Sequence, residues 1–312
     1  MIRRDFIKKA TVMGGLAPLI RPVSIFSQKT PPAELDFNIF SKHLQFLNYS
    51  DMAKAAADIG FKGVELTVRP GGHVEPENVE GDLPLAIEAI KKAGLQHRTM
   101  TTAVDNAQDP VDRKVLQIAA NLGIEFYRMN WLSYDSQKTI PESIKSFQST
   151  IRELGELNAE LGIVGCYQNH AGTRAGASLW ELHQMLATAN PESMGAQYDI
   201  RHATVEGGLS WVNGLRLIQP RIETIVLKDF KWVESNGEWK VQDTPIGEGM
   251  VDFVSYFKML KEFNLQVPIT VHYEHSLGGA ERGRSELTIP HNKVFKAMEK
   301  DIETLNTLWK SA

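Results

Sequence analysis

Side chains that move protons or bind metal ions stand at the ends of four short β-branched runs in the C-terminal half of the chain. These residues are His170, Asp199, His202, Lys228, His272 and Glu274. In the last run, Ile269-Thr-Val-His-Tyr-Glu-His275, strand side chains alternate between two faces, so His272 and Glu274 emerge together. An imidazole beside a carboxylate suits acid–base chemistry or metal binding. We therefore expect these strand ends to converge on one site.

The elements that would position this site alternate along the chain. Eight strand candidates are Phe37–Phe40, Gly63–Val68, Gln96–Thr101, Glu125–Asn130, Ile163–Gln168, Gly195–Asp199, Ile222–Lys228 and Ile269–Glu274. Helix candidates between them include Ser50–Ile59, Leu83–Ala93, Pro110–Leu122 and Pro141–Leu161. Ser50 or Asp51 is placed to cap the first helix.

Several of these helices end on a glycine that leads directly into the next strand. The glycines are Gly60, Gly94, Gly123 and Gly162. Eight such strand–helix units predict one closed (β/α)8 TIM barrel. A doubly wound open sheet is the alternative, but the first strand lacks the glycine-rich phosphate turn that such a sheet normally has. After the seventh strand, Asn236-Gly237 within Phe230–Val241 predicts an inserted β-hairpin over the barrel mouth.

The N-terminus, residues 1–30, is interpreted as a signal peptide rather than as part of the fold. Arg3-Arg4-Asp-Phe-Ile-Lys-Lys9 precedes an apolar run, Ala10 to Ile20, that is too short to span a membrane. This pattern is typical of a twin-arginine export signal and predicts a periplasmic protein whose mature domain is residues 31–312, beginning near Gln28 to Pro32. The alternative is a basic amphipathic N-terminus.

Composition limits the classes of partner. The chain is 42% hydrophobic and 23% charged with a formal net charge of -4, so it lacks the basic footprint that nucleic-acid binding needs. The single cysteine, Cys166, excludes an internal disulfide. The mature domain has about the usual size of one β/α barrel. We expect a small-molecule ligand and no membrane span in the mature form, and a homo-oligomer is compatible with the sequence.

Several motifs together resemble a known family. They are Gly60-Phe-Lys-Gly-Val-Glu-Leu66, Gly94-Leu, Leu122-Gly-Ile124, Tyr167-Gln-Asn-His-Ala-Gly-Thr173, Asp199 with His202, Lys228-Asp229, Pro245-Ile-Gly-Glu-Gly249 and Glu274. As a set they resemble the xylose isomerase-like TIM barrels, which include sugar-phosphate isomerases, epimerases, inosose dehydratases and endonuclease IV. The resemblance spans essentially the whole mature chain.

The resemblance implies a divalent metal ion bound at the ends of strands five to eight. Asp199 matches the aspartate of strand six and Glu274 the glutamate of strand eight. His170 and His202 lie near the correct strand ends to complete the site, and the ion would be Mn, Zn, Co, Fe or Mg. For His202, a supporting hydrogen bond to a ligand is the alternative role.

The chain departs from the family pattern at two positions. Strand five offers Gln168-Asn-His170 in place of a glutamate, and Val226 stands where strand seven often has a histidine. The metal site is therefore either rebuilt with histidines or lost. If it is lost, Lys228 points to the same side as Val226 and would stabilise an enolate by its charge. An ion pair with a nearby carboxylate is the alternative for Lys228.

Residues from the first half of the chain are expected to complete the pocket. The predicted substrate contacts are Arg69, His73, Arg128, Trp131 and His272. Glu65 belongs to a position that usually faces the barrel mouth in the family, which makes it a candidate catalytic residue. A buried charge needs a partner, so Glu65 and Arg128 neutralising each other is the alternative.

The resemblance implies proton abstraction from the carbon next to a carbonyl group. The resulting enediolate would be held by a metal ion or a cation, with Glu274, Glu65 or His170 as the base and Lys228 as the alternative cation. Reprotonation gives a sugar isomerase or epimerase, whereas loss of a β-substituent gives a lyase or dehydratase. Because export favours non-phosphorylated sugars, inositols or keto-glycosides, we expect such a carbohydrate substrate. A non-catalytic carbohydrate-binding barrel is the remaining alternative.

Overall fold

The computed structural model describes residue 32 and residues 34–312. The proposed export signal lies outside the described residues, so its prediction stays a prediction. None of the helices in this described part is long and apolar enough to cross a membrane.

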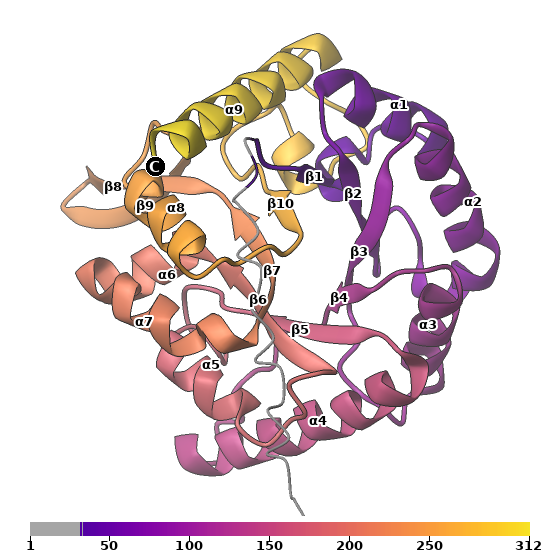
Figure 1. Cartoon of the computed structure of the whole chain (residues 1–312), viewed down its shortest axis with the longest axis vertical. Coiled ribbons are helices and arrows are strands. Elements are labelled where there is room, and N and C mark those ends of the chain that lie inside the picture. The colour runs from indigo at the N-terminus through magenta and orange to yellow at the C-terminus, as the bar shows by residue number, and fades with distance from the viewer. Residues whose placement is uncertain (1–31, 33) are drawn as a thin grey trace, which may run out of the picture. The chain divides into compact units, whose positions relative to one another are not determined.

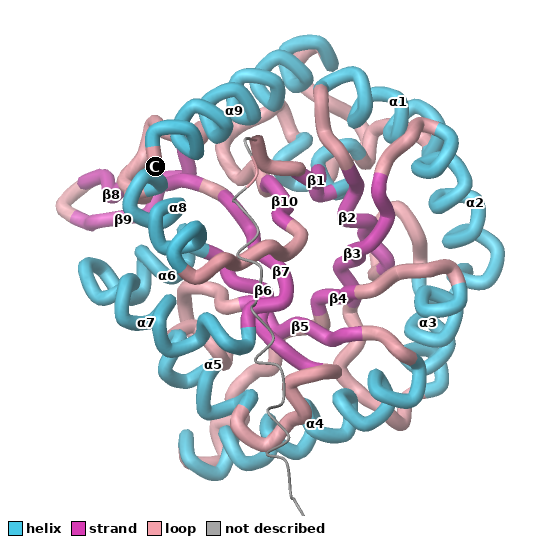
Figure 2. Tube along the Cα trace, viewed as in Figure 1, coloured by secondary structure: helices cyan, strands magenta, loops and turns pink. Residues whose placement is uncertain are grey.

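Eight parallel strands close into a barrel, as the sequence predicts (Figures 1 and 2). The strands are β1 (Phe37–Phe40), β2 (Gly63–Val68), β3 (Gln96–Thr102), β4 (Phe126–Arg128), β5 (Val164–Gln168), β6 (Met194–Asp199), β7 (Ile222–Leu227) and β10 (Ile269–Val271). Each strand pairs with its sequence neighbours, and β10 pairs with β1, where Phe37 faces Ile269, to close the ring.

Helices form the outer layer of the barrel (Figure 2). They are α1 (Tyr49–Ile59), α2 (Val79–Lys92), α3 (Pro110–Asn121), α4 (Ile140–Leu161), α5 (Leu179–Leu186), α6 (Ile200–Gly207), α7 (Trp211–Ile218), α8 (Phe253–Glu262) and α9 (His291–Ser311). Short 3-10 turns accompany them, of which η1 (Ser41–Leu44) directly follows β1. The predicted helix starts are corrected at α1, where Asn48 rather than Ser50 or Asp51 is the cap, and at α2, which begins before Leu83 and includes Pro84.

The glycines that end the helices have the backbone conformation that the sequence predicts. Gly60, Gly94, Gly123 and Gly162 all have positive φ, between 71° and 107°. An L-residue with a Cβ atom adopts this left-handed conformation only with strain, so glycine ends each helix and redirects the chain into the next strand. The same turn therefore connects four helices of the barrel to the strands that follow them.

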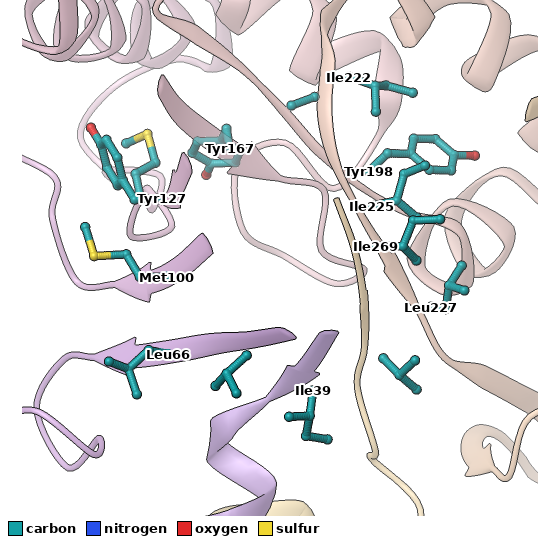
Figure 3. Close-up of a cluster of buried hydrophobic side chains, with 14 of the residues drawn as sticks. Ile39, Leu66, Met100, Tyr127, Tyr167, Tyr198, Ile222, Ile225, Leu227 and Ile269 are labelled. Atoms are coloured by element: carbon teal, nitrogen blue, oxygen red, sulfur yellow. The ribbon is translucent and has the colours of Figure 1, made fainter. Parts of the chain in front are cut away.

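Strand residues alternate between an outer apolar face and an inner polar one. The labelled side chains of Figure 3, including Leu66, Met100 and Ile225, belong to the buried hydrophobic cluster. The residues that alternate with them are buried polar ones, such as Glu65 and Thr101. Because successive strand side chains point to opposite faces, the barrel interior is polar and leads toward the strand ends.

The predicted hairpin is present as β8 (Asp229–Ser235) paired antiparallel with β9 (Glu238–Thr244). Asn236 and Gly237 both have positive φ, 56° and 80°, as a two-residue hairpin turn that matches strand twist requires. The prediction that it covers the mouth is wrong: Figure 1 shows it extending outward from the ring. Asp243 at its base forms an ion pair with Arg201 beside β6.

Asp229 anchors the segment that returns from this hairpin. Its carboxylate accepts hydrogen bonds from the backbone N–H groups of Phe230, Gly247, Gly249 and Val251. A Cβ atom at Gly249 would lie 2.2 Å from Oδ1 of Asp229, which explains the glycine in Pro245-Ile-Gly-Glu-Gly249. The carboxylate of Asp229 thus has a structural role, in which it fixes the backbone of residues 247–251.

Candidate active site

The C-terminal strand ends bring the predicted polar residues to one edge of the barrel. Asp199 ends β6, Lys228 follows β7, and His272 and Glu274 follow β10, which stops at Val271 and is shorter than predicted. The predicted alternation persists past the strand end, because Tyr273 contacts Met298 of α9 while Glu274 faces Lys228.

The ammonium group of Lys228 occupies the centre of this cluster. Its Nζ lies 3.1 Å from Oδ2 of Asp199, 2.8 Å from Nε2 of His202 and 3.9 Å from Oε1 of Glu274. Lys228 is only 4% exposed. Since an ionised side chain in such a position needs opposite charge and hydrogen-bond partners, Asp199 and His202 fix the ammonium in place.

Asp199 is in turn held by the two polar residues that end strand five. The side-chain amide of Gln168 donates to Oδ2 of Asp199 at 2.9 Å. Asn169 brackets the Asp199 backbone, accepting from its N–H at 2.8 Å and donating to its carbonyl oxygen at 3.0 Å. Oδ1 of Asp199 caps α6 by accepting from the N–H of His202 at 3.1 Å. Where the family has a glutamate, this chain therefore has amides that orient Asp199.

Glu274 lies between two ammonium groups. Besides Lys228, Lys42 of η1 places its Nζ 3.4 Å from both carboxylate oxygens of Glu274. Burial raises the pKa of Glu274, but the charges of Lys228, Lys42 and His272 outweigh it and leave the pKa below its usual value. Burial lowers the pKa of Lys42, and Glu274 opposes that shift. Glu274 is therefore an anion at neutral pH.

The sequence prediction missed Lys42. It follows β1 in Phe40-Ser-Lys-His43, and a polar residue at that strand end is the same signal that pointed to the later strands.

His170 presents a neutral imidazole at the same edge. Its Nδ1 lies 2.9 Å from the carbonyl oxygen of Ala171, which only accepts, so Nδ1 carries the proton and Nε2 keeps its lone pair. Burial, followed by the charge of Lys228, lowers the pKa of His170 to about 4. The ring packs against His202, with centroids 4.1 Å apart.

The arrangement does not fit the divalent metal ion that the resemblance implies. The predicted ligands are Asp199, Glu274, His202 and His170. The ammonium of Lys228 forms ion pairs with Asp199 and Glu274 and contacts Nε2 of His202, and the amide of Gln168 donates to Asp199 as well. Val226 on β7 is a buried apolar residue. In the part of the chain that the structure describes, no group of three or more histidine, cysteine, aspartate or glutamate residues is placed to hold a metal ion.

Glu65 and His272 form a buried pair inside the barrel. Nε2 of His272 lies 3.9 Å from Oε2 of Glu65, while Thr101 and Gln197 donate hydrogen bonds to Oε1. Burial raises the pKa of Glu65, but hydrogen bonding and charge from His272, together with Thr101, outweigh it and bring the pKa to about 2. Glu65 is fully buried, which favours a role in holding His272, stacked 4.2 Å from Phe40, over direct contact with a substrate.

Arg128 and Trp131 lie together at the end of β4. The guanidinium carbon of Arg128 is 4.0 Å from the centre of the Trp131 ring, and that of Arg174 is 4.6 Å from it. The indole N–H donates to the carbonyl oxygen of Gln168 at 3.2 Å. Arg128 forms no ion pair with Glu65 or another carboxylate among the described residues, although the charge of Glu65 raises the pKa of Arg128. Arg174 was not predicted.

The other two predicted substrate contacts, Arg69 and His73, lie in different surroundings. Arg69 stacks over Phe40, 5.5 Å from the ring centre, and stays near the cluster. His73 instead faces Ser41, whose Oγ lies 3.1 Å from its Nδ1, and burial lowers the pKa of His73 to about 4. His73 is therefore a packing residue between η1 and the loop after β2.

Comparison with known proteins places the chain in a family. A family model described as the xylose isomerase-like TIM barrel matches residues 53–291. The chain belongs to the xylose isomerase-like TIM barrel family. No curated protein matches its sequence significantly.

Solved structures of other proteins share this fold at low sequence identity. The 3-keto-D-glucoside 4-epimerase from E. coli is 14% identical, with a TM-score of 0.64 over 87% of this chain and 100% of that one. The D-allulose 3-epimerase from Methylomonas sp. is 16% identical, with a TM-score of 0.64 over 89% and 99%. A probable 3-DHS dehydratase from Bacillus anthracis is 15% identical, with a TM-score of 0.62 over 87% and 98%. The barrel is thus one on which sugar epimerases and a dehydratase are built.

Proposed function

We propose that this family member is a sugar isomerase- or epimerase-type enzyme that removes a proton from the carbon next to a carbonyl group. Its substrate is a non-phosphorylated sugar, an oxidised inositol or a keto-glycoside. The observation that carries the proposal is the ammonium of Lys228, fixed by Asp199 and His202 and only 3.9 Å from the carboxylate of Glu274.

The reaction needs a cation where negative charge develops and a base beside it. A C–H next to a carbonyl is a weak acid, and a preorganised cation lowers its pKa by stabilising the enediolate oxygen. Lys228, with Lys42 beyond Glu274, supplies that charge from the protein itself. Glu274 and the free Nε2 of His170 are both deprotonated at neutral pH and are the candidate bases.

Lys42 bears on the fate of the enediolate. Lys42 is a half-buried ammonium with a lowered pKa that already donates to Glu274, so it can return a proton to carbon through Glu274 or deliver one to a departing hydroxyl. The second outcome is β-elimination, which makes a lyase or dehydratase the second candidate. Both outcomes share the same proton abstraction.

The location of the enzyme is part of the proposal. Arg3-Arg4 and the apolar run after them support export by the twin-arginine pathway to the periplasm. Phosphorylated sugar intermediates are cytoplasmic, so an exported enzyme meets free sugars and glycosides.

Deuterium incorporation from heavy water tests the proposal without knowledge of the product. The purified enzyme is incubated with a panel of free ketoses, inososes and 3-keto-glycosides, and the carbon next to the carbonyl is followed by NMR. We expect exchange with at least one of them and no loss of exchange after treatment with a chelator. Absence of exchange across the panel would favour the carbohydrate-binding barrel, and exchange that stops with the chelator would restore the metal-dependent mechanism.

A further inference from the structure

Arg128 is a buried cation that forms no ion pair in the part of the chain that the structure describes. Its side chain is 3% exposed, and its Nε and Nη1 have no hydrogen-bond partner among the described residues. Nη2 has one long contact, 3.5 Å to the carbonyl oxygen of Thr102. Burial and the neighbouring charge of Arg69 lower the pKa of Arg128 to about 9 against the opposing charge of Glu65, so the guanidinium remains protonated at neutral pH.

Two further guanidinium groups lie close enough to Arg128 to act on its charge. Arg69 and Arg174 both act on the charge of Arg128, and both lie on aromatic rings, Arg69 on Phe40 and Arg174 on Trp131. The ion pairs at the mouth use other residues, and none in the described part of the chain includes any of the three arginines. The charges of Glu65 and Glu274 act on these arginines only from beyond ion-pair distance, and the close packing partners of the three guanidinium groups are aromatic rings.

Such an arrangement is unfavourable for folding by itself. A buried charge costs free energy unless it is paired, and like charges repel. A ligand that carries negative charge removes both penalties, and a guanidinium presents a planar fork of N–H donors that matches a carboxylate. Nε and Nη1 of Arg128 have no partner among the described residues and remain available as donors to such a ligand.

The arginines are continuous with the candidate active site. Trp131, on which Arg128 stacks, lies 4.8 Å from the ring of His170, and His170 lies 4.1 Å from that of His202. His202 contacts Lys228 at 2.8 Å. These contacts connect the arginines to the reacting centre through Trp131, His170 and His202.

We propose that Arg69, Arg128 and Arg174 form a subsite for the carboxylate of a sugar acid, which makes the substrate of the proposed reaction a uronic- or aldonic-type sugar. That the sugar acid is a substrate rests on the proposed function. The binding of the anion stands on the arginines alone.

Equilibrium binding tests the subsite independently of turnover. Titration calorimetry at low ionic strength compares D-glucuronate, D-galacturonate, D-mannuronate and D-gluconate with D-glucose, inorganic phosphate and sulfate. We expect at least one sugar acid to bind, glucose to bind at least about tenfold more weakly, and Arg128→Met to weaken the sugar acid roughly 10- to 100-fold, as loss of a charged hydrogen bond does. The side chains of Arg69 and Arg174 are more exposed than that of Arg128, and we expect Arg69→Met and Arg174→Met to weaken binding of the sugar acid as well.

The matched control is Arg98→Met. Arg98 is an arginine of β3 whose fork is already satisfied by Glu125 at 2.7 and 2.6 Å, so its loss leaves sugar-acid binding unchanged. Thermal unfolding gives a second readout: Arg128→Met keeps the melting temperature of the free protein, because an unpaired charge is removed, yet loses the stabilisation by the sugar acid.

Several outcomes overturn the subsite. They are equal affinity for glucose, no binding of any of the four sugar acids, phosphate or sulfate binding in their place, and unchanged binding in Arg128→Met. Solvent exchange on a neutral sugar without selective binding of a sugar acid would overturn the subsite and leave the proposed reaction standing. Selective binding without exchange would do the reverse.

Discussion

Replacement of Lys228 by methionine tests whether a protein ammonium does the work of a metal ion. The change removes the charge from the point shared by Asp199, His202 and Glu274 and keeps a chain of similar length. Loss of one preorganised stabilising group costs about 100- to 1,000-fold in rate, or roughly 3–4 kcal/mol. We therefore expect deuterium exchange to fall by about two to three orders of magnitude.

The same change affects folding, and the size of the effect follows from the remaining contacts. Breaking a buried ion pair typically costs about 3–5 kcal/mol because one charge loses its partner. Asp199 keeps hydrogen bonds from Gln168 at 2.9 Å and from the backbone of His202 at 3.1 Å, so we expect the lower end of that range. At roughly 2–4 °C per kcal/mol for a domain of this size, the melting temperature falls by about 6–12 °C.

The assay measures exchange at a temperature where both proteins are folded, with Lys54→Met as the control. Lys54 is an exposed lysine of α1 that pairs with Asp58, so its loss leaves exchange and stability nearly unchanged. Elemental analysis accompanies the kinetics. A Lys228→Met variant that keeps wild-type exchange would refute the reasoning, as would a wild-type enzyme that carries a stoichiometric metal ion and stops when it is removed.

Three further predictions concern other residues. Glu274→Gln removes both the negative charge between two ammonium groups and a candidate base, so exchange falls by about two orders of magnitude or more while far-UV circular dichroism is unchanged. In the folded protein His73 and His170 have pKa values of about 4, against an ordinary value of 6.5 for histidine, so their contribution to stability is present above pH 6.5 and is lost as the pH falls toward 4. Urea unfolding at pH 7 and pH 5 measures this loss, and equal unfolding free energies would contradict it. Replacing Arg3 and Arg4 by lysine traps the precursor in the cytoplasm, and undiminished periplasmic delivery would count against the signal.

Periodic patterns made most of the fold predictable. Helix-ending glycines and β-branched runs are local signals, so the eight strands and the closed barrel follow from the sequence with boundaries that shift by a few residues. The errors have local causes as well: α2 begins before Leu83 because Pro84 is accommodated inside the helix, and the hairpin turns outward because Asp229 fixes its return segment.

The sequence by itself also determined that Asp199, His170, His202, Lys228 and Glu274 meet at one edge, because parallel strands of a barrel end on the same side. It did not determine their roles. Whether a carboxylate faces a metal ion or an ammonium depends on contacts between residues far apart in the chain. Lys42 and Glu274, separated by 232 positions, meet only when β10 closes the ring on β1. The lack of an ion pair at Arg128 among the described residues is likewise a property of the assembled interior. The sequence offered Glu65 as the partner of Arg128, but in the fold the carboxylate of Glu65 contacts Thr101, Gln197 and His272.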